Sequence, residues 1–352
     1  MAAEAGLPGS GPGDTRQRRL PRPPLFVLAP ARSCSSVVVC MLGQHPQLYG
    51  FPELRLFRTS HVDGLLVDPP AGRGIPARER GSGLVRALAQ LHDGEQTPGT
   101  LDRAWQWLED RQDWTVVAVL DQLLALVDPL VGVEKSPETS LSDDALNRAE
   151  AAYPQARYLH LVRHPWSTVA SMTSAWGPLG YWNVEPSRAA DYCGRLWLEQ
   201  HRRIDGLACR VGPERYLRVR AEDVVNEPLA VLPSVCRWLG ITDDADDLAC
   251  MTSPEESAYA NPGPPQWTGG FDPAFLRQPK LHTVVVPAGL QAPPSWLVGA
   301  STQAEVAALA TDFGYAGNDE RHVVHSAARL RGLGHYRTAS GSGRHGAQHL
   351  QR

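Results

Sequence analysis

A short apolar segment near the N-terminus constrains the fold of this chain more than any other feature of the sequence. Residues 25–29 carry no polar side chain and are followed by Pro30. A strand that is apolar at every position is buried on both faces, which is typical of a parallel sheet covered by helices. Residues 158–162 and 216–220 are further strand candidates, each followed by a helical pattern, and 131–133 is a shorter one. The sequence therefore predicts an α/β fold, a three-layer sandwich with a central parallel sheet.

Both ends of the chain and one internal stretch lack the periodicity of helices and strands. Residues 1–23 and 326–352 are rich in Gly and Arg, and such segments cannot bury enough apolar surface to offset the entropy lost on ordering. We expect them to be a disordered leader and a disordered tail around one domain at 24–325. Residues 58–100 contain many Gly, Pro and Arg residues and are predicted to form a variable, irregular insertion, either a lid or a disordered loop.

The overall composition argues against several classes of protein. A net charge of -4 gives no general attraction to nucleic acid or to an anionic membrane, so any anion site must be built locally. No stretch approaches the roughly 18 consecutive apolar residues of a membrane span, and no signal-type apolar run follows the N-terminal arginines. The six cysteines lack the spacing of metal ligands and the density of a disulfide scaffold. A cytoplasmic protein with reduced thiols, no metal site and no nucleic-acid partner is expected.

A polar loop, PARSCSS at residues 30–36, joins the first predicted strand to an apolar stretch that can continue as a helix. Free backbone N–H groups and the positive end of the helix dipole favour an anion at such a turn, and Arg32 and the hydroxyl groups add charge-assisted hydrogen bonds. The usual P-loop sequence, with its lysine, is absent. Taken alone, these residues also allow an ordinary serine-capped turn, or a reactive thiol at Cys34.

Arg163 offers a second anion site, because it ends the predicted strand 158–162 and Pro165 suits the first turn of a helix. An isolated Arg near a helix start is more often a surface ion pair than a ligand. When Arg163 is considered together with the polar loop at 30–36, however, a role in binding an anion becomes the favoured interpretation. Two anion sites at neighbouring strand ends suit a nucleotide with phosphate at both its 3′ and 5′ positions, since open α/β sheets bind ligands there.

In this order, the two motifs resemble those of the sulfotransferases that use 3′-phosphoadenosine 5′-phosphosulfate (PAPS). FVLAPARSCSS and MLGQHPQLYGFPEL are similar to the family's 5′-phosphosulfate loop and the segment after it, with Cys34 where many relatives have Gly. Ser171 follows Arg163 by eight residues, as in the family's 3′-phosphate motif. The resemblance covers about residues 24–280 and implies a fold like that of the P-loop nucleotide kinases and PAPS as co-substrate, without a metal. The cofactor-binding residues that it implies are Arg32, Ser33, Cys34, Ser35, Ser36, Arg163 and Ser171.

The resemblance also implies two catalytic residues. Glu53, in the sequence GFPE, is similar to the glutamate base of carbohydrate and tyrosyl-protein sulfotransferases, and Lys135, in VEKSP, to the lysine that steadies the bridging oxygen of the leaving group. Small phenol and steroid sulfotransferases instead use a His shortly after this lysine, where this chain has Ser136 and Pro137. This difference favours a glutamate mechanism. Without the resemblance, each charge could equally be a solvated surface group.

The predicted function is transfer of a sulfuryl group from PAPS to a hydroxyl or amine of a small-molecule or carbohydrate acceptor, with Glu53 as general base. One alternative is a non-catalytic binder of PAPS or its bisphosphate product, motivated by Cys34 and by Ala221, which replaces a Tyr that often holds the adenine. The other is a small-molecule kinase, which the missing P-loop lysine disfavours. Residues 267–273 resemble a loop that could close over the cofactor, and 176–182 are expected to shape the acceptor pocket together with the insertion.

Overall fold

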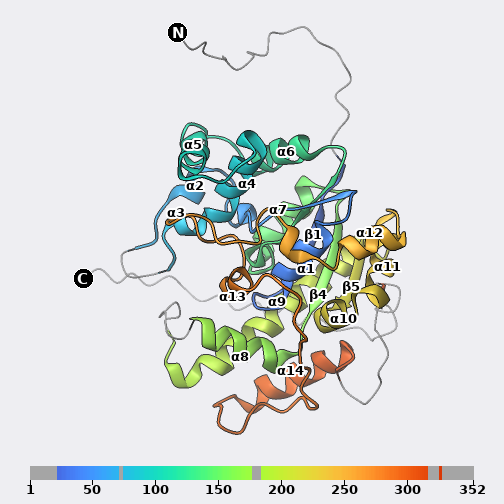
Figure 1. Ribbon diagram of the computed structural model, residues 1–352. Coiled ribbons are helices and arrows are strands. Elements are labelled where there is room, and N and C mark those ends of the chain that lie inside the picture. The colour runs from blue at the N-terminus through green and yellow to red at the C-terminus, as the bar shows by residue number, and fades with distance from the viewer. Residues whose placement is uncertain (1–21, 71–73, 177–183, 316–324, 327–352) are drawn as a thin grey trace, which may run out of the picture.

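A six-stranded sheet in the order β2-β3-β1-β4-β5-β6 forms the centre of the fold (Figure 1). The computed structural model describes residues 22–70, 74–176, 184–315 and 325–326 of the chain. Strands β1 to β5 run parallel, and the short β6 pairs antiparallel to β5. The strands are β1 (Leu25–Leu28), β2 (Leu48–Gly50), β3 (Val131–Glu134), β4 (Arg157–Val162), β5 (Tyr216–Arg220) and β6 (His325–Ser326). The predicted parallel sheet is confirmed, and β2, which has only three residues, is a strand that the sequence did not reveal.

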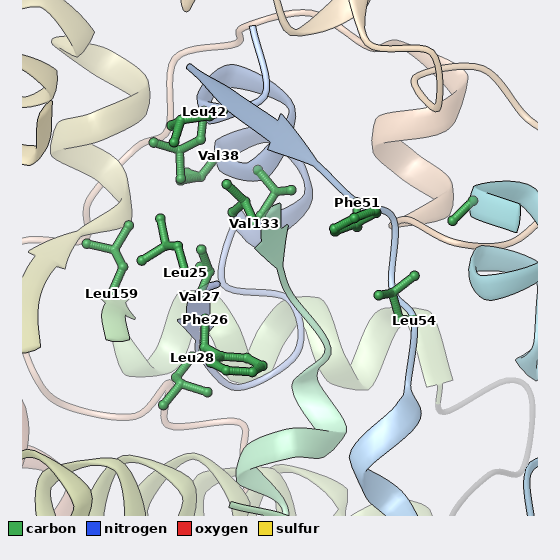
Figure 2. Packing of buried hydrophobic residues seen from close by; sticks show 14 of the residues in the cluster. Leu25, Phe26, Val27, Leu28, Val38, Leu42, Phe51, Leu54, Val133 and Leu159 are labelled. Atoms are coloured by element: carbon green, nitrogen blue, oxygen red, sulfur yellow. The ribbon is translucent and has the colours of Figure 1, made fainter. Parts of the chain in front are cut away.

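Strand β1 is buried at every position, as its apolar sequence predicts. It pairs with β3 on one side and with β4 on the other, so that Phe26 lies beside both Glu134 and Tyr158. Figure 2 shows the β1 side chains packed among Val38, Val133 and Leu159, which come from the following helix and the two neighbouring strands. This packing fixes the carboxyl end of β1 in the middle of the sheet, where the polar loop begins.

Helices flank the sheet and connect its strands (Figure 1). Helix α1 (Ser35–Leu42) follows the polar loop directly, and α8 (Pro165–Trp176) begins three residues after β4 ends. No helix of the described ranges is long and apolar enough to cross a membrane. The remaining helices outside residues 58–115 are α6 (Val116–Val127), α7 (Asp143–Ala152), α9 (Ala189–Val211), α10 (Ala221–Asn226), α11 (Pro228–Leu239), α12 (Ala245–Cys250), α13 (Pro273–Arg277) and α14 (Ala300–Asp312).

The expectation of an irregular insertion over residues 58–100 is wrong. Outside 71–73, which the structure does not describe, this range holds α2 (Asp63–Leu66), α3 (Ala77–Arg80), α4 (Ser82–Asp93) and the start of α5 (Pro98–Glu109), which lie together with α6 in Figure 1. The Gly and Pro residues mark helix ends: Gly94 ends α4 with a φ of 76°, and Pro98 opens α5. A Thr97–Thr100 capping box fixes the start of α5. The composition therefore indicated helix boundaries, not disorder.

The predicted disordered segments fall mostly outside the described residues. Residues 1–21 of the expected leader and 327–352 of the expected tail lie there, as do 177–182 of the segment expected to shape the acceptor pocket. Ser326, the first residue of the expected tail, belongs to β6 and pairs with Leu217 of β5.

Candidate active site

The loop between β1 and α1 turns sharply through two residues in the left-handed conformation. Arg32 has a φ of 67° and Cys34 a φ of 59°, and neither is glycine. Ser33, Ser35 and Ser36 are all buried, and the Ser33 hydroxyl has no hydrogen-bond partner within the described part of the chain. A buried hydroxyl without a partner is costly unless a ligand satisfies it. The loop is therefore built to receive a polar group from outside the protein.

The surroundings of the Cys34 thiol disfavour the role of reactive nucleophile that the sequence left open. Loss of hydration in the loop raises its pKa to about 11, and this effect exceeds the opposing influence of the Arg163 charge. The sulfur is therefore protonated at neutral pH, and a thiol is a poor nucleophile compared with a thiolate. Cys34 precedes α1 at the position where many members of the resembled family have Gly, and the left-handed backbone explains that preference.

The structure brings the two predicted anion motifs into direct contact. Strands β1 and β4 are parallel neighbours, so their carboxyl ends, and the residues after them, meet at one edge of the sheet. Arg32 donates from Nε to Ser171 Oγ at 2.9 Å, and Arg163 donates from Nη1 to the Arg32 carbonyl oxygen at 2.6 Å. The Arg163 Nε is buried and has no hydrogen-bond partner in the ranges that the structure describes. An anion between the two arginines would provide that partner.

The two predicted catalytic residues also meet, beside the same loop. Glu53 follows β2 and Lys135 follows β3, which is its parallel neighbour, and the exposed fractions of these residues are only 8% and 2%. Lys135 Nζ lies 2.5 Å from Glu53 Oε1 and 3.3 Å from Ser36 Oγ. The lysine thus connects the carboxylate to the hydroxyl groups of the anion loop.

Arg55, which the sequence analysis did not select, completes this cluster. It donates to the second oxygen of Glu53 from Nη2 at 2.7 Å and from Nε at 3.2 Å, and its Nε lies 3.3 Å from Glu138 Oε1. Burial alone would raise the pKa of Glu53, but the charges of Lys135 and Arg55 and their hydrogen bonds outweigh it and hold the pKa below its usual range. Glu53 is consequently ionised at neutral pH. The position of Arg55 two residues after Glu53 was the signal available in the sequence.

The C-terminal loop at 267–273 closes against the anion loop. The Asp272 carboxylate forms an ion pair with Arg32, and the Asp272 N–H group donates to Ser36 Oγ at 3.0 Å. The Gly270 carbonyl oxygen accepts a hydrogen bond of 2.7 Å from the N–H group of Glu53. One carboxylate of the protein therefore already lies against a predicted anion-binding arginine.

A cavity of about 680 Å³ opens at this edge of the sheet. Its lining includes Arg32, Ser36, Glu53 and Lys135. Gly74 and Ile75, which lie between α2 and α3, also line it, and they belong to the range 58–100 that was expected to shape an acceptor pocket. Ala221 is fully buried at the start of α10 and is not among the lining residues, whereas Val225 of the same helix is. No group of three or more His, Cys, Asp or Glu side chains in the described ranges could hold a metal ion.

Comparison with known proteins gives a consistent result. A family model described as the sulfotransferase family matches residues 23–246. The sulfotransferase domain from the curacin biosynthetic pathway superposes with a TM-score of 0.64 at 22% identity, over 83% of this chain and 98% of that domain. The sulfotransferase domain from the Synechococcus PCC 7002 olefin synthase gives a TM-score of 0.59 at 25% identity, over 85% of this chain and 98% of that domain. No curated protein matches the sequence. The predicted fold class, an α/β sandwich with a P-loop-like sheet, is confirmed.

Proposed function

Because this chain belongs to the sulfotransferase family, we propose that it transfers a sulfuryl group from PAPS to a hydroxyl or amine group of a small acceptor. The observation that carries the proposal is the meeting of two arginines at the ends of adjacent strands, with Arg32 bonded to Ser171 and Arg163 bonded to the loop of Arg32. PAPS carries anionic groups at both ends of one ribose. A site with two neighbouring cationic pockets suits such a ligand.

The residues present fit this donor. Arg163, with its unpartnered Nε, and Ser171 would hold the 3′-phosphate. Arg32 and the buried loop from Ser33 to Ser36 would hold the 5′-phosphosulfate, and the free Ser33 hydroxyl supports this assignment. The positive end of α1 adds to the attraction for the anion.

In the proposed reaction, Glu53 accepts the proton of the acceptor hydroxyl while the acceptor oxygen forms a bond to sulfur. The bond between sulfur and the phosphate oxygen breaks, and adenosine 3′,5′-bisphosphate (PAP) leaves. Lys135, which contacts both Glu53 and Ser36, neutralises the charge that develops on the departing oxygen. Fixed charges that require no rearrangement during the reaction are usually the largest contribution to such catalysis.

The cavity favours a small molecule with an apolar body over a carbohydrate acceptor. Leu141 and Tyr192 line it and keep 42% and 40% of their surface exposed, which a ligand with apolar groups would cover. A hydroxyl-rich sugar would leave this apolar surface without a matching partner. The apolar side chains that line the cavity include Ile75, Leu141, Tyr192, Leu196, Phe271 and Phe275.

Ligand titration tests the donor assignment. PAP should bind about 100-fold more tightly than adenosine 5′-monophosphate, which lacks the 3′-phosphate, and Arg163→Ala should remove most of this preference. Calorimetry on the wild type and the variant measures both affinities. Equal affinity of the two nucleotides for the wild-type protein would contradict the proposed 3′-phosphate site.

Turnover with labelled PAPS tests catalysis. Glu53→Gln is expected to lower kcat by about two to four orders of magnitude, because the general base is lost, while the affinity for PAP changes little. Glu199→Gln, on the exposed face of α9, is the matched control and should behave as the wild type. PAP binding without transfer to any of a panel of apolar alcohols, phenols and amines would favour the non-catalytic binder.

A further inference from the structure

Arg55 adopts a backbone conformation that needs an explanation. Its φ is 53°, in the left-handed region that non-glycine residues seldom occupy. The Arg55 N–H group donates to Ser136 Oγ at 2.8 Å, and the Ser136 hydroxyl donates to the buried Glu134 at 2.5 Å. Strained residues persist where their surroundings fix them, and they concentrate at functional sites. This chain of hydrogen bonds therefore holds Arg55 at a defined place beside the catalytic pair.

The side chain of Arg55 is enclosed by two carboxylates. Both of its contacts with Glu53 go to Oε2, whereas Lys135 contacts Oε1, so the carboxylate has one cation at each oxygen. Glu138, in the turn after Lys135, lies 3.3 Å from the same Nε that contacts Glu53. Two donors of the planar Arg55 guanidinium converge on Oε2, so this oxygen is held from one direction while Lys135 holds the other. Arg55 thus fixes the Oε2 end of the Glu53 carboxylate.

We propose that Arg55 is a positioning residue for sulfuryl transfer, which holds the Glu53 carboxylate in place and keeps it ionised when the charge of Lys135 is shared with the donor. The inference rests on the proposed role of Glu53 as general base. Lys135 cannot neutralise both Glu53 and the departing phosphate oxygen at full strength. Once Lys135 is shared with the donor, Arg55 is the cation that remains on Glu53.

A buried carboxylate without a cation takes up a proton and then cannot act as a base. With two cations beside it, Glu53 holds the charge firmly but is a weak base, since its pKa is low. When the charge of Lys135 is shared with the donor, one of the two causes that lower the pKa of Glu53 weakens, so its pKa rises and Glu53 becomes a stronger base. Arg55 therefore allows Glu53 to be ionised before the reaction and basic during it.

The alternative role for Arg55, recognition of an anionic group on the acceptor, is disfavoured by its existing contacts. Its Nε and Nη2 are already committed to Glu53, and Glu138 adds a second negative charge next to the guanidinium. An acceptor anion would have to approach both carboxylates. Loss of an arginine that recognises the acceptor would raise the KM for the acceptor, whereas loss of an arginine that positions Glu53 would lower kcat.

The test measures the pH dependence of kcat/KM for Arg55→Gln and Arg55→Lys, with PAPS and one apolar alcohol as substrates. Removing the guanidinium raises the pKa of Glu53, so the acidic limb of the profile of Arg55→Gln should move to higher pH, and kcat at pH 7 should fall about 10- to 100-fold. Arg55→Lys should restore part of the activity and part of the shift. Arg103→Gln, an arginine of α5 whose side chain is 64% exposed, is the control and should leave the profile unchanged.

Three outcomes would overturn the inference. The first is loss of activity in Arg55→Gln that is equal at every pH, and the second is a rise in acceptor KM alone. The third is full activity of Arg55→Gln in a protein that still binds PAP. Failure of the proposed function has a different signature, because Glu53→Gln would then retain turnover. Affinity for PAP, expected to stay within about threefold of the wild type in Arg55→Gln, verifies that the variant is folded.

Discussion

Cys34 occupies a backbone position that glycine adopts most easily, and the protein keeps a side chain there. The left-handed conformation costs a non-glycine residue about 1 kcal/mol, which the packing of the loop must offset. Arg32, two residues earlier, and Arg55, beside Glu53 and Lys135, also have a left-handed backbone. Of the four non-glycine residues with a positive φ in the described ranges, these three line the cavity, and the fourth, Gln266, directly precedes the loop at 267–273. Local strain is therefore concentrated where ligands are expected to bind.

Substitutions at Cys34 should separate backbone strain from thiol chemistry. Cys34→Gly is expected to change the free energy of unfolding by less than about 1 kcal/mol, because relief of strain offsets the greater freedom of Gly in the unfolded chain. Cys34→Val should lower it by about 2 kcal/mol, since a β-branched side chain strongly disfavours a positive φ. Urea denaturation of the two variants measures the difference. Equal stability of the Gly and Val variants would show that the conformation imposes no strain.

Glu134 should make stability depend on pH in a defined window. Burial raises its pKa to about 7, although the hydrogen bond from Ser136 opposes the shift, and one carboxyl oxygen has no partner in the described ranges. Between about pH 4.5 and 7 the folded protein keeps a proton that the unfolded chain releases, so this group lowers stability as pH rises through that window.

Glu134→Gln removes this titration. The free energy of unfolding of the variant, relative to that of the wild type, should be higher at pH 8 than at pH 5 by about 2 to 3 kcal/mol, because most of the titration of Glu134 falls between these pH values. Thermal or urea unfolding of both proteins at the two pH values measures this effect. The contributions of other titrating groups are the same in both proteins and cancel in the comparison. A difference near zero would mean that Glu134 is ionised in the folded protein at both pH values.

At the scale of elements, the loop at 267–273 and the loop after β1 form one unit. Asp272 donates its backbone N–H to Ser36 and pairs its carboxylate with Arg32, while Gly270 binds the backbone of Glu53. The later loop thus contacts both the anion loop and the residue proposed as base. A carboxylate against Arg32 competes with any phosphate or sulfate that the same arginine would hold.

Asp272→Asn should therefore strengthen the binding of PAP by about 3- to 10-fold, because an internal competitor and a repulsive charge are both removed. The gain should be larger at low ionic strength, where charges are screened less. Calorimetric titration at two salt concentrations measures it, with Asp243→Asn, in the exposed turn after α11, as the control. Weaker binding of PAP by Asp272→Asn would mean that Asp272 supports the ligand directly.

At the scale of the whole molecule, the site joins segments that are far apart in the sequence. Parallel strands bring the residues after β1, β2, β3 and β4 to one edge, so that Arg32, Glu53, Lys135 and Arg163 line or adjoin one cavity. Residues beyond the range of the family match take part as well: Tyr315 donates a hydrogen bond to Glu222, which accepts another from the backbone of His164, next to Arg163. The C-terminal part of the chain therefore helps to fix the second anion loop.

The sequence by itself determined the features that depend on local pattern and chain order. An apolar run predicted β1, and the spacing of eight between Arg163 and Ser171 identified a pair that contacts the first loop in the structure. Glu53 and Lys135 were selected by resemblance, and the structure brings them together. The strands could be predicted because residues that are close in the chain encode them, whereas the roles of the site residues rest on the resemblance and stay predictions.

Only the tertiary structure decided which charges neutralise one another. Arg55 between Glu53 and Glu138, and Asp272 on Arg32, are contacts whose formation depends on how separate segments pack. The helices of residues 58–100 were likewise hidden, because Gly and Pro at helix ends give the same composition as an irregular loop. Periodicity records which face of an element is buried, but it carries no information on which distant side chain a buried charge will meet.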